Sequence, residues 1–109
     1  MKQYTDKQQT AKLIELGFEK PTMAPPILKW VNGEPTFESQ YTIGELIEML
    51  PKEITNVGLT DSLSIYTDHN KMWAVEYSNV LGELLSSYRT ELIDALYDMI
   101  IKLKEEGVI

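Results

Sequence analysis

The pattern of hydrophobic and polar positions is clearest in the C-terminal part of the chain. Hydrophobic side chains recur there every three or four residues, and charged side chains lie on the opposite side. This spacing predicts an amphipathic helix from about Tyr88 to Glu106, with Ser87 as its N-cap. The hydrophobic arc is wider than one sheet face requires. We therefore expect its surplus, Tyr97 and Ile101, to be covered by a homodimer partner, by another protein or by the first helix.

Two shorter helices are predicted nearer the N-terminus, because each hydrophobic stripe follows a pair of residues with capping-box spacing. The first helix covers about residues 6–16, and Gly17 can close it. The second covers about residues 43–50, and Pro51 ends it. The two capping pairs are Thr5 with Gln8 and Thr42 with Glu45.

Two hairpins are predicted between these helices. The first turns at Asn32-Gly33, a dipeptide that strongly favours a two-residue hairpin loop. The second hairpin turns around residues 68–71 and joins two strands in which hydrophobic and polar residues alternate. Only a loop with an odd number of residues places the large hydrophobic side chains of both strands on one face. We interpret residues 52–61 as a loop and leave residues 79–86 open between helix and loop. The predicted pairs are Leu28 with Phe37, Trp30 with Pro35, Leu63 with Tyr77, and Ile65 with Val75.

These elements predict one α+β domain over residues 1–109. Its antiparallel sheet consists of two hairpins, its three helices cover one face, and the order is α-ββ-α-ββ-α.

Composition and charge narrow the function classes. The chain has 17 acidic and 10 basic residues, a net charge of −7 that disfavours nucleic acids and anionic membranes. It has no cysteine, which excludes disulfides and thiolate chemistry. The sequence shows no signal peptide and no hydrophobic run long enough to span a bilayer, so we expect a cytoplasmic protein.

Candidate catalytic chemistry is sparse. The single histidine, His69, lies in a predicted turn, where Asp, His and Asn are common for structural reasons. Glu91, Asp94 and Asp98 share a side of the last helix that we expect to be solvated. We therefore expect no catalytic residue, no cofactor and no metal site. Strand alternation points Tyr66 outward beside small polar residues, which makes it a candidate protein contact.

Three stretches of the chain carry a resemblance to a known group of proteins. They are Gln9 to Leu13, Thr42 to Pro51, and the C-terminal run from Glu91 to Gly107. Together they resemble small uncharacterised proteins of prophages and mobile elements in anaerobic gut bacteria. The resemblance implies a phage or mobile-element context, and it implies no activity.

Three functional hypotheses remain open. The first is a non-enzymatic accessory or protein-interaction protein, which the acidic charge and the lack of a catalytic constellation favour. The second is an acidic decoy that occupies a nucleic-acid site on a host protein. The third is a small metal-dependent or hydrolytic enzyme that uses His69.

Overall fold

The computed structural model describes residues 2–19, 27–38, 40–56, 59–68 and 70–109. The described elements make an α+β fold, as predicted, but their order is α-ββ-α-ββββ-α. They are α1 (Lys7–Glu15), β1 (Ile27–Val31), β2 (Glu34–Glu38), α2 (Ile43–Met49), β3 (Glu53–Asn56), β4 (Leu59–Thr67), β5 (Trp73–Asn79), β6 (Gly82–Arg89) and α3 (Leu92–Glu105).

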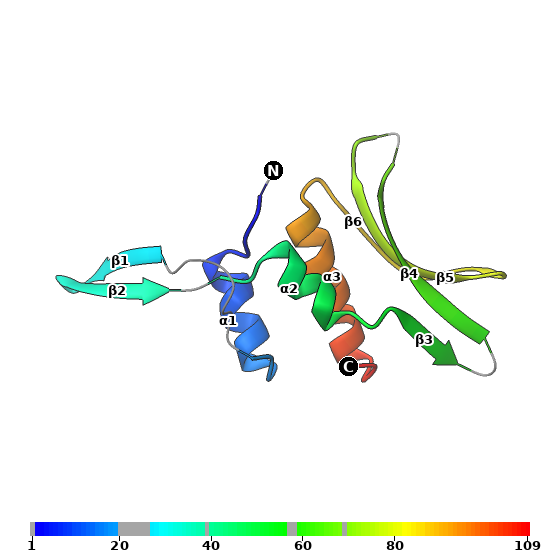
Figure 1. Cartoon of the computed structure of the whole chain (residues 1–109), viewed down its shortest axis with the longest axis horizontal. Coiled ribbons are helices and arrows are strands. Elements are labelled where there is room, and N and C mark those ends of the chain that lie inside the picture. Colours follow the sequence, from blue (N-terminus) through cyan, green and yellow to red (C-terminus); the bar gives the residue numbers. More distant parts are fainter. Residues whose placement is uncertain (1, 20–26, 39, 57–58, 69) are drawn as a thin grey trace.

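The strands form two separate sheets, where one sheet of two hairpins was predicted. Strands β3, β4, β5 and β6 form a four-stranded antiparallel sheet in that order. Strands β1 and β2 pair only with each other, and their hairpin projects away from the helices (Figure 1). The α3 helix lies against β5 and β6 (Figure 1), and α2 packs against α3.

The two additional strands correct two predictions. Residues 53–56, predicted as loop, form β3 by pairing with the start of β4, although only Ile54 among them is hydrophobic. Residues 82–86, left open between helix and loop, belong to β6. The register shifts beside Tyr77, so that Leu84 is an extra residue between two consecutive pairs. Such a bulge breaks the alternation by which a strand is recognised in a sequence.

The starts of two helices also differ from the prediction. Helix α3 begins at Leu92 with Glu91 as its N-cap, and the predicted cap, Ser87, instead pairs with Val75 inside the sheet. Sheet pairing therefore overrides the helical spacing that includes Tyr88. Helix α1 is capped one residue later than predicted. Its capping box joins Asp6 and Gln9, while the Thr5 hydroxyl accepts a hydrogen bond from the backbone N–H of Tyr41.

Other local predictions are confirmed. The capping box of α2 joins Thr42 and Glu45 in both directions. At the first turn, Asn32 and Gly33 both have positive φ, 53° and 80°, as a two-residue hairpin loop requires. The second hairpin has the odd-loop register. The observed pairs include Leu28 with Phe37, Trp30 with Pro35, Leu63 with Tyr77, and Ile65 with Val75.

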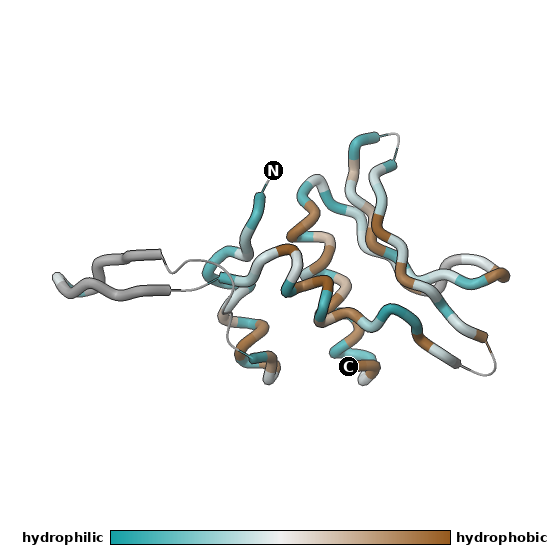
Figure 2. Tube along the Cα trace, in the orientation of Figure 1, coloured by the Kyte–Doolittle hydropathy of each residue, from teal (hydrophilic) through white to brown (hydrophobic). Residues whose placement is uncertain are grey.

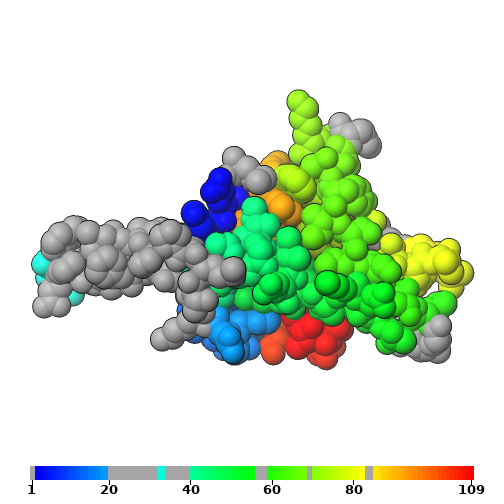
Figure 3. All heavy atoms as spheres, in the orientation of Figure 1, coloured from blue at the N-terminus to red at the C-terminus, as the bar shows by residue number. Residues whose placement is uncertain are grey.

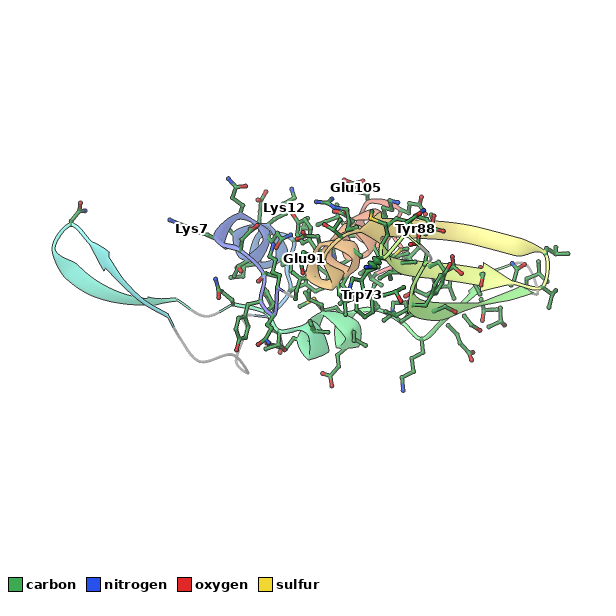
Figure 4. The ribbon with its side chains drawn as sticks, turned by 90° about the horizontal axis from the view of Figure 1, so that it is seen from above. Lys7, Lys12, Trp73, Tyr88, Glu91 and Glu105 are labelled. Atoms are coloured by element: carbon green, nitrogen blue, oxygen red, sulfur yellow. The ribbon has the colours of Figure 1, made fainter. Side chains whose placement is uncertain are left out.

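The core lies between the four-stranded sheet and the helices. Seen from above, α3 lies between α1 and the sheet (Figure 4), and the core includes buried residues of α1, α3 and the sheet. The core residues are Leu13, Tyr41, Leu46, Leu50, Val75, Tyr77, Leu92, Ile93, Ala95, Leu96, Met99, Ile100 and Leu103.

Two polar contacts fasten α3 to the edge strand β6. Arg89 forms an ion pair of 2.6 Å with Asp98 on the helix. The ammonium group of Lys102 donates a hydrogen bond to the backbone carbonyl of Ser86. Both contacts hold the last strand against the last helix.

Candidate functional site

The four-stranded sheet has one face that the three described helices leave uncovered. Alternation places Leu63, Ile65, Val75 and Tyr77 on the inner face, against α3. The residues between them point away from the helices, and we call their surface the outer face. The outer face is formed by Ser62, Ser64 and Tyr66 of β4, Ala74, Glu76 and Ser78 of β5, and Ser86 and Tyr88 of β6.

Two tyrosines flank a small residue at the centre of the outer face. Ala74 pairs with Tyr66 on one side and with Tyr88 on the other. Ala74 is fully buried, although it points away from the core, while Tyr66 and Tyr88 are 40% and 42% exposed. Because cross-strand neighbours stand about 5 Å apart, the two rings cover the alanine and present their outer surfaces to solvent.

Hydrogen bonds fix the position of Tyr66. Its hydroxyl donates a hydrogen bond of 3.0 Å to the Glu76 carboxylate. This bond, with smaller contributions from desolvation and from the hydroxyl of Tyr88, raises the pKa of Tyr66 to about 12. At neutral pH the Tyr66 hydroxyl keeps its proton and donates it to the Glu76 carboxylate.

The charge of the outer face is negative. Glu76 lies in its middle row, between Ser64 and Ser86, and Glu53 of β3 pairs with Ser62 at its border. No lysine or arginine occupies any of the outer-face positions defined above. The surface thus combines two tyrosine rings, several small hydroxyl groups and carboxylates.

The three predicted contact residues lie in different places. Tyr66 is on the outer face, whereas Tyr97 and Ile101 are half-buried and packed against the core from α3. Burial, together with the nearby carboxylates of Asp98 and Asp6, raises the pKa of Tyr97. Since Asp6 is the N-cap of α1, the start of the first helix lies close to Tyr97. The contact through Tyr97 and Ile101 stays a prediction.

The carboxylates singled out on the last helix are engaged in structural contacts. The backbone N–H of Lys2 donates a hydrogen bond of 2.8 Å to the Glu91 carboxylate. The ammonium group of Lys2 donates a hydrogen bond of the same length to the Asp94 carboxylate. Asp98 pairs with Arg89. Burial opposes ionisation of Asp94, but the hydrogen bonds from Lys2 and Gln9 outweigh it and lower the pKa of that carboxyl.

Within the described ranges, no cluster of three or more His, Cys, Asp or Glu residues could hold a metal ion. His69 lies outside the described residues.

The helices of the described part are too short or too polar to cross a membrane.

Sequence reasoning missed half of the aromatic pair. Tyr88 was assigned to a helix, so its position beside Tyr66 was not foreseen. The segment Ser86-Ser87-Tyr88-Arg89 has no regular alternation of hydrophobic and polar residues that would mark it as a strand. Sequence reasoning also missed the turn between β5 and β6, where Val80 and Leu81 are strongly exposed.

Comparison with protein-family models, with curated proteins and with solved structures finds no match to this chain.

Proposed function

We propose that this chain is a non-enzymatic protein-interaction protein, and that the outer face of its four-stranded sheet binds the partner. The observation that carries the proposal is the exposed tyrosine pair over the buried Ala74, on a sheet face without a helix. Tyrosine is enriched at protein interfaces because it combines a large apolar surface with a hydrogen-bonding hydroxyl.

The arrangement lowers the entropic cost of binding. The rings of Tyr66 and Tyr88 pack over Ala74, and the Tyr66 hydroxyl is already bonded to Glu76. Side chains that are restrained before binding lose less conformational freedom in the complex. The surrounding serines add small, adaptable hydrogen-bonding groups, a combination that antibody paratopes also use.

The charge of the surface supports a basic partner. Glu53 and Glu76 would meet complementary cations, and the net charge of −7 would accelerate such an encounter at low salt. The same charge favours one alternative, an acidic decoy that occupies a nucleic-acid site on a host protein. A cytoplasmic location and a mobile-element origin belong to this proposal as predictions.

Paired captures from lysate test the proposal. The wild type and the Tyr66→Ala plus Tyr88→Ala variant serve as baits, and the protein enriched by the wild type is then purified and its affinity measured. The matched control is Tyr4→Ala, because Tyr4 is 37% exposed but lies in the N-terminal segment. We expect the double variant to bind at least tenfold more weakly and the control to bind like the wild type.

Two outcomes separate the alternatives. If nucleic acid competes with the chain for the purified partner, the decoy function is favoured. If the double variant binds as well as the wild type, the outer face is not the binding surface.

A further inference from the structure

The loop of the first hairpin joins an asparagine directly to a glycine. Asn32 and Gly33 are both exposed, and their φ values are 53° and 80°. Figure 3 shows them, in cyan, at the far end of the projecting hairpin, and Figure 2 shows that this tip is hydrophilic. Water therefore reaches the loop freely.

An asparagine followed by a glycine can react with its own backbone. The Gly33 nitrogen gives up its proton and attacks Cγ of Asn32, forming a C–N bond that closes a succinimide ring, while the side-chain nitrogen leaves as ammonia. Water then adds to either ring carbonyl and breaks the bond between that carbonyl and the ring nitrogen. Opening at Cγ leaves aspartate, and opening at the backbone carbonyl leaves isoaspartate, in which the main chain runs through Cβ.

The residue that follows each asparagine decides how easily this attack occurs. Glycine obstructs it least, because no Cβ stands beside the attacking nitrogen. The other asparagines of the chain precede Val57, Lys71 and Val80. The Asn79 side chain is also restrained, because it accepts a hydrogen bond from the backbone N–H of Leu81 and donates one to Asp61. Asn32 is therefore the asparagine whose surroundings favour the reaction most.

The hairpin that carries Asn32 can open more easily than the four-stranded sheet. Among the described strands, β1 and β2 pair only with each other. A hairpin of two strands without a third is only marginally stable in water. Ring closure requires the Asn32 backbone to leave its turn conformation, so that Cγ can meet the Gly33 nitrogen. A brief local opening of this hairpin permits that rotation.

We propose that Asn32 is a self-modification site, at which the Gly33 nitrogen displaces the side-chain amide, and that the isoaspartate product unpairs the β1–β2 hairpin. The net reaction consumes water and releases ammonia, and it needs no other reactant. The proposal is independent of the proposed function, because Asn32 and Gly33 lie outside the outer face.

The two products change the hairpin in different ways. Aspartate at position 32 adds a negative charge beside Glu34 but keeps the backbone, and Asp-Gly suits the same loop. Isoaspartate lengthens the main chain of the loop by Cβ. The two-residue geometry that pairs Val31 with Glu34 is then lost.

Ageing of the purified full chain in warm, mildly alkaline buffer tests the modification. Mass spectrometry of peptides follows the exchange of –NH2 for –OH at each asparagine, and endoproteinase Asp-N cleaves before aspartate but not before isoaspartate. Asn70 is the matched control within the same molecule, because it is also an exposed turn residue. We expect Asn32 to deamidate at least about tenfold faster than Asn70, since Lys71 carries a side chain beside its nitrogen. Equal rates at the two positions would overturn the proposal.

Gly33→Lys isolates the contribution of the glycine. Lysine already occupies the second turn with a positive φ of 61°, at Lys71. We expect the substitution to slow deamidation of Asn32 by at least about tenfold. Strain that opened the hairpin would make ring closure easier, so a slower reaction cannot come from misfolding. An unchanged rate would overturn the proposal.

Amide hydrogen exchange of residues 27–38 tests the effect on the hairpin. The isoaspartate form is separated from the aged chain by chromatography, and we expect it to exchange faster in this segment than the fresh chain. Asn32→Asp is the matched control, and it should exchange like the fresh chain. Exchange in α3, which lies in the core, should be the same in every form. Identical exchange of residues 27–38 in the isoaspartate form and the fresh chain would overturn the proposed unpairing.

Discussion

The hydroxyl of Tyr66 and the carboxylate of Glu76 lie 3.0 Å apart on the outer face of the sheet, joined by a hydrogen bond. The two residues belong to adjacent strands and are diagonal neighbours, since Tyr66 pairs with Ala74, two positions before Glu76. Ionisation of the hydroxyl would remove the donor and leave two negative charges at this distance. The contact therefore couples the state of the proposed binding surface to alkaline pH.

This coupling predicts a late tyrosine titration. The pKa of Tyr66 is raised from an ordinary 10.0 to about 12. The resulting stabilisation is complete below pH 10 and is lost as the pH rises toward 12, because the unfolded state releases its proton first. The difference between the absorbance titrations of the wild type and Tyr66→Phe at roughly 295 nm should show a tyrosine that ionises near pH 12. A difference curve centred near pH 10 would contradict this contact.

The contact of Lys2 with Asp94 predicts an acid-sensitive contribution to stability. The pKa of Asp94 is lowered from 3.8, so its stabilisation is present above that value and is lost as the pH falls through the lower folded value. Both groups are partly exposed. We therefore expect Asp94→Asn to reduce the free energy of unfolding by at most about 1 kcal/mol at pH 7. The difference in the free energy of unfolding between the wild type and Asp94→Asn, measured by urea denaturation, should become smaller near pH 2. Glu105→Gln, on the exposed last turn of α3, is the control, and an equal loss there would refute the assignment.

The turn between β4 and β5 predicts a stabilising substitution. Lys71 has a φ of +61°, a left-handed conformation that is costly for a residue with a Cβ atom. Glycine adopts it freely, although it also makes the unfolded chain more flexible. We expect Lys71→Gly to raise the free energy of unfolding by up to about 1 kcal/mol, measured by thermal denaturation. Met72→Gly is the comparison, and it should destabilise.

The predicted homodimer requires Tyr97 and Ile101 to meet a second chain. Sedimentation of the wild type should then show a dimer at high concentration, and Tyr97→Lys plus Ile101→Lys should convert it to a monomer. Because both side chains also pack against the core, melting curves must show that the variant remains folded. A wild type that stays monomeric at high concentration would rule out this interface.

Local signals in the sequence were sufficient where one physical requirement dominates. The capping box of Thr42 and Glu45 uses adjacent backbone and side-chain groups, so its spacing identified α2. The pairing of Ile65 with Val75 follows from the need to place large hydrophobic residues on the buried face. The outward position of Tyr66 follows from the same alternation.

Other features depend on contacts between segments that are distant in the sequence. Strand β3 exists because its backbone pairs with β4, and its side chains give little sign of this. The start of α3 is set by the pairing of Ser87 and Tyr88 with β5, which competes with their helical spacing. The tyrosine pair became visible only when β6 was placed beside β5, so half of the candidate site could not be predicted.

The hydrogen bond from Lys102 to the carbonyl of Ser86 affects how readily another chain can pair with the edge of the sheet at high protein concentration. Strand β6 is the last strand of the sheet, and an edge strand offers its free backbone groups to any extended segment that approaches. The ammonium group already occupies one of these carbonyls. An incoming strand would have to displace it, which leaves a strongly hydrated charge at the new seam. We therefore expect the same lysine that fastens the helix to the sheet to make the addition of a further strand at that edge less favourable.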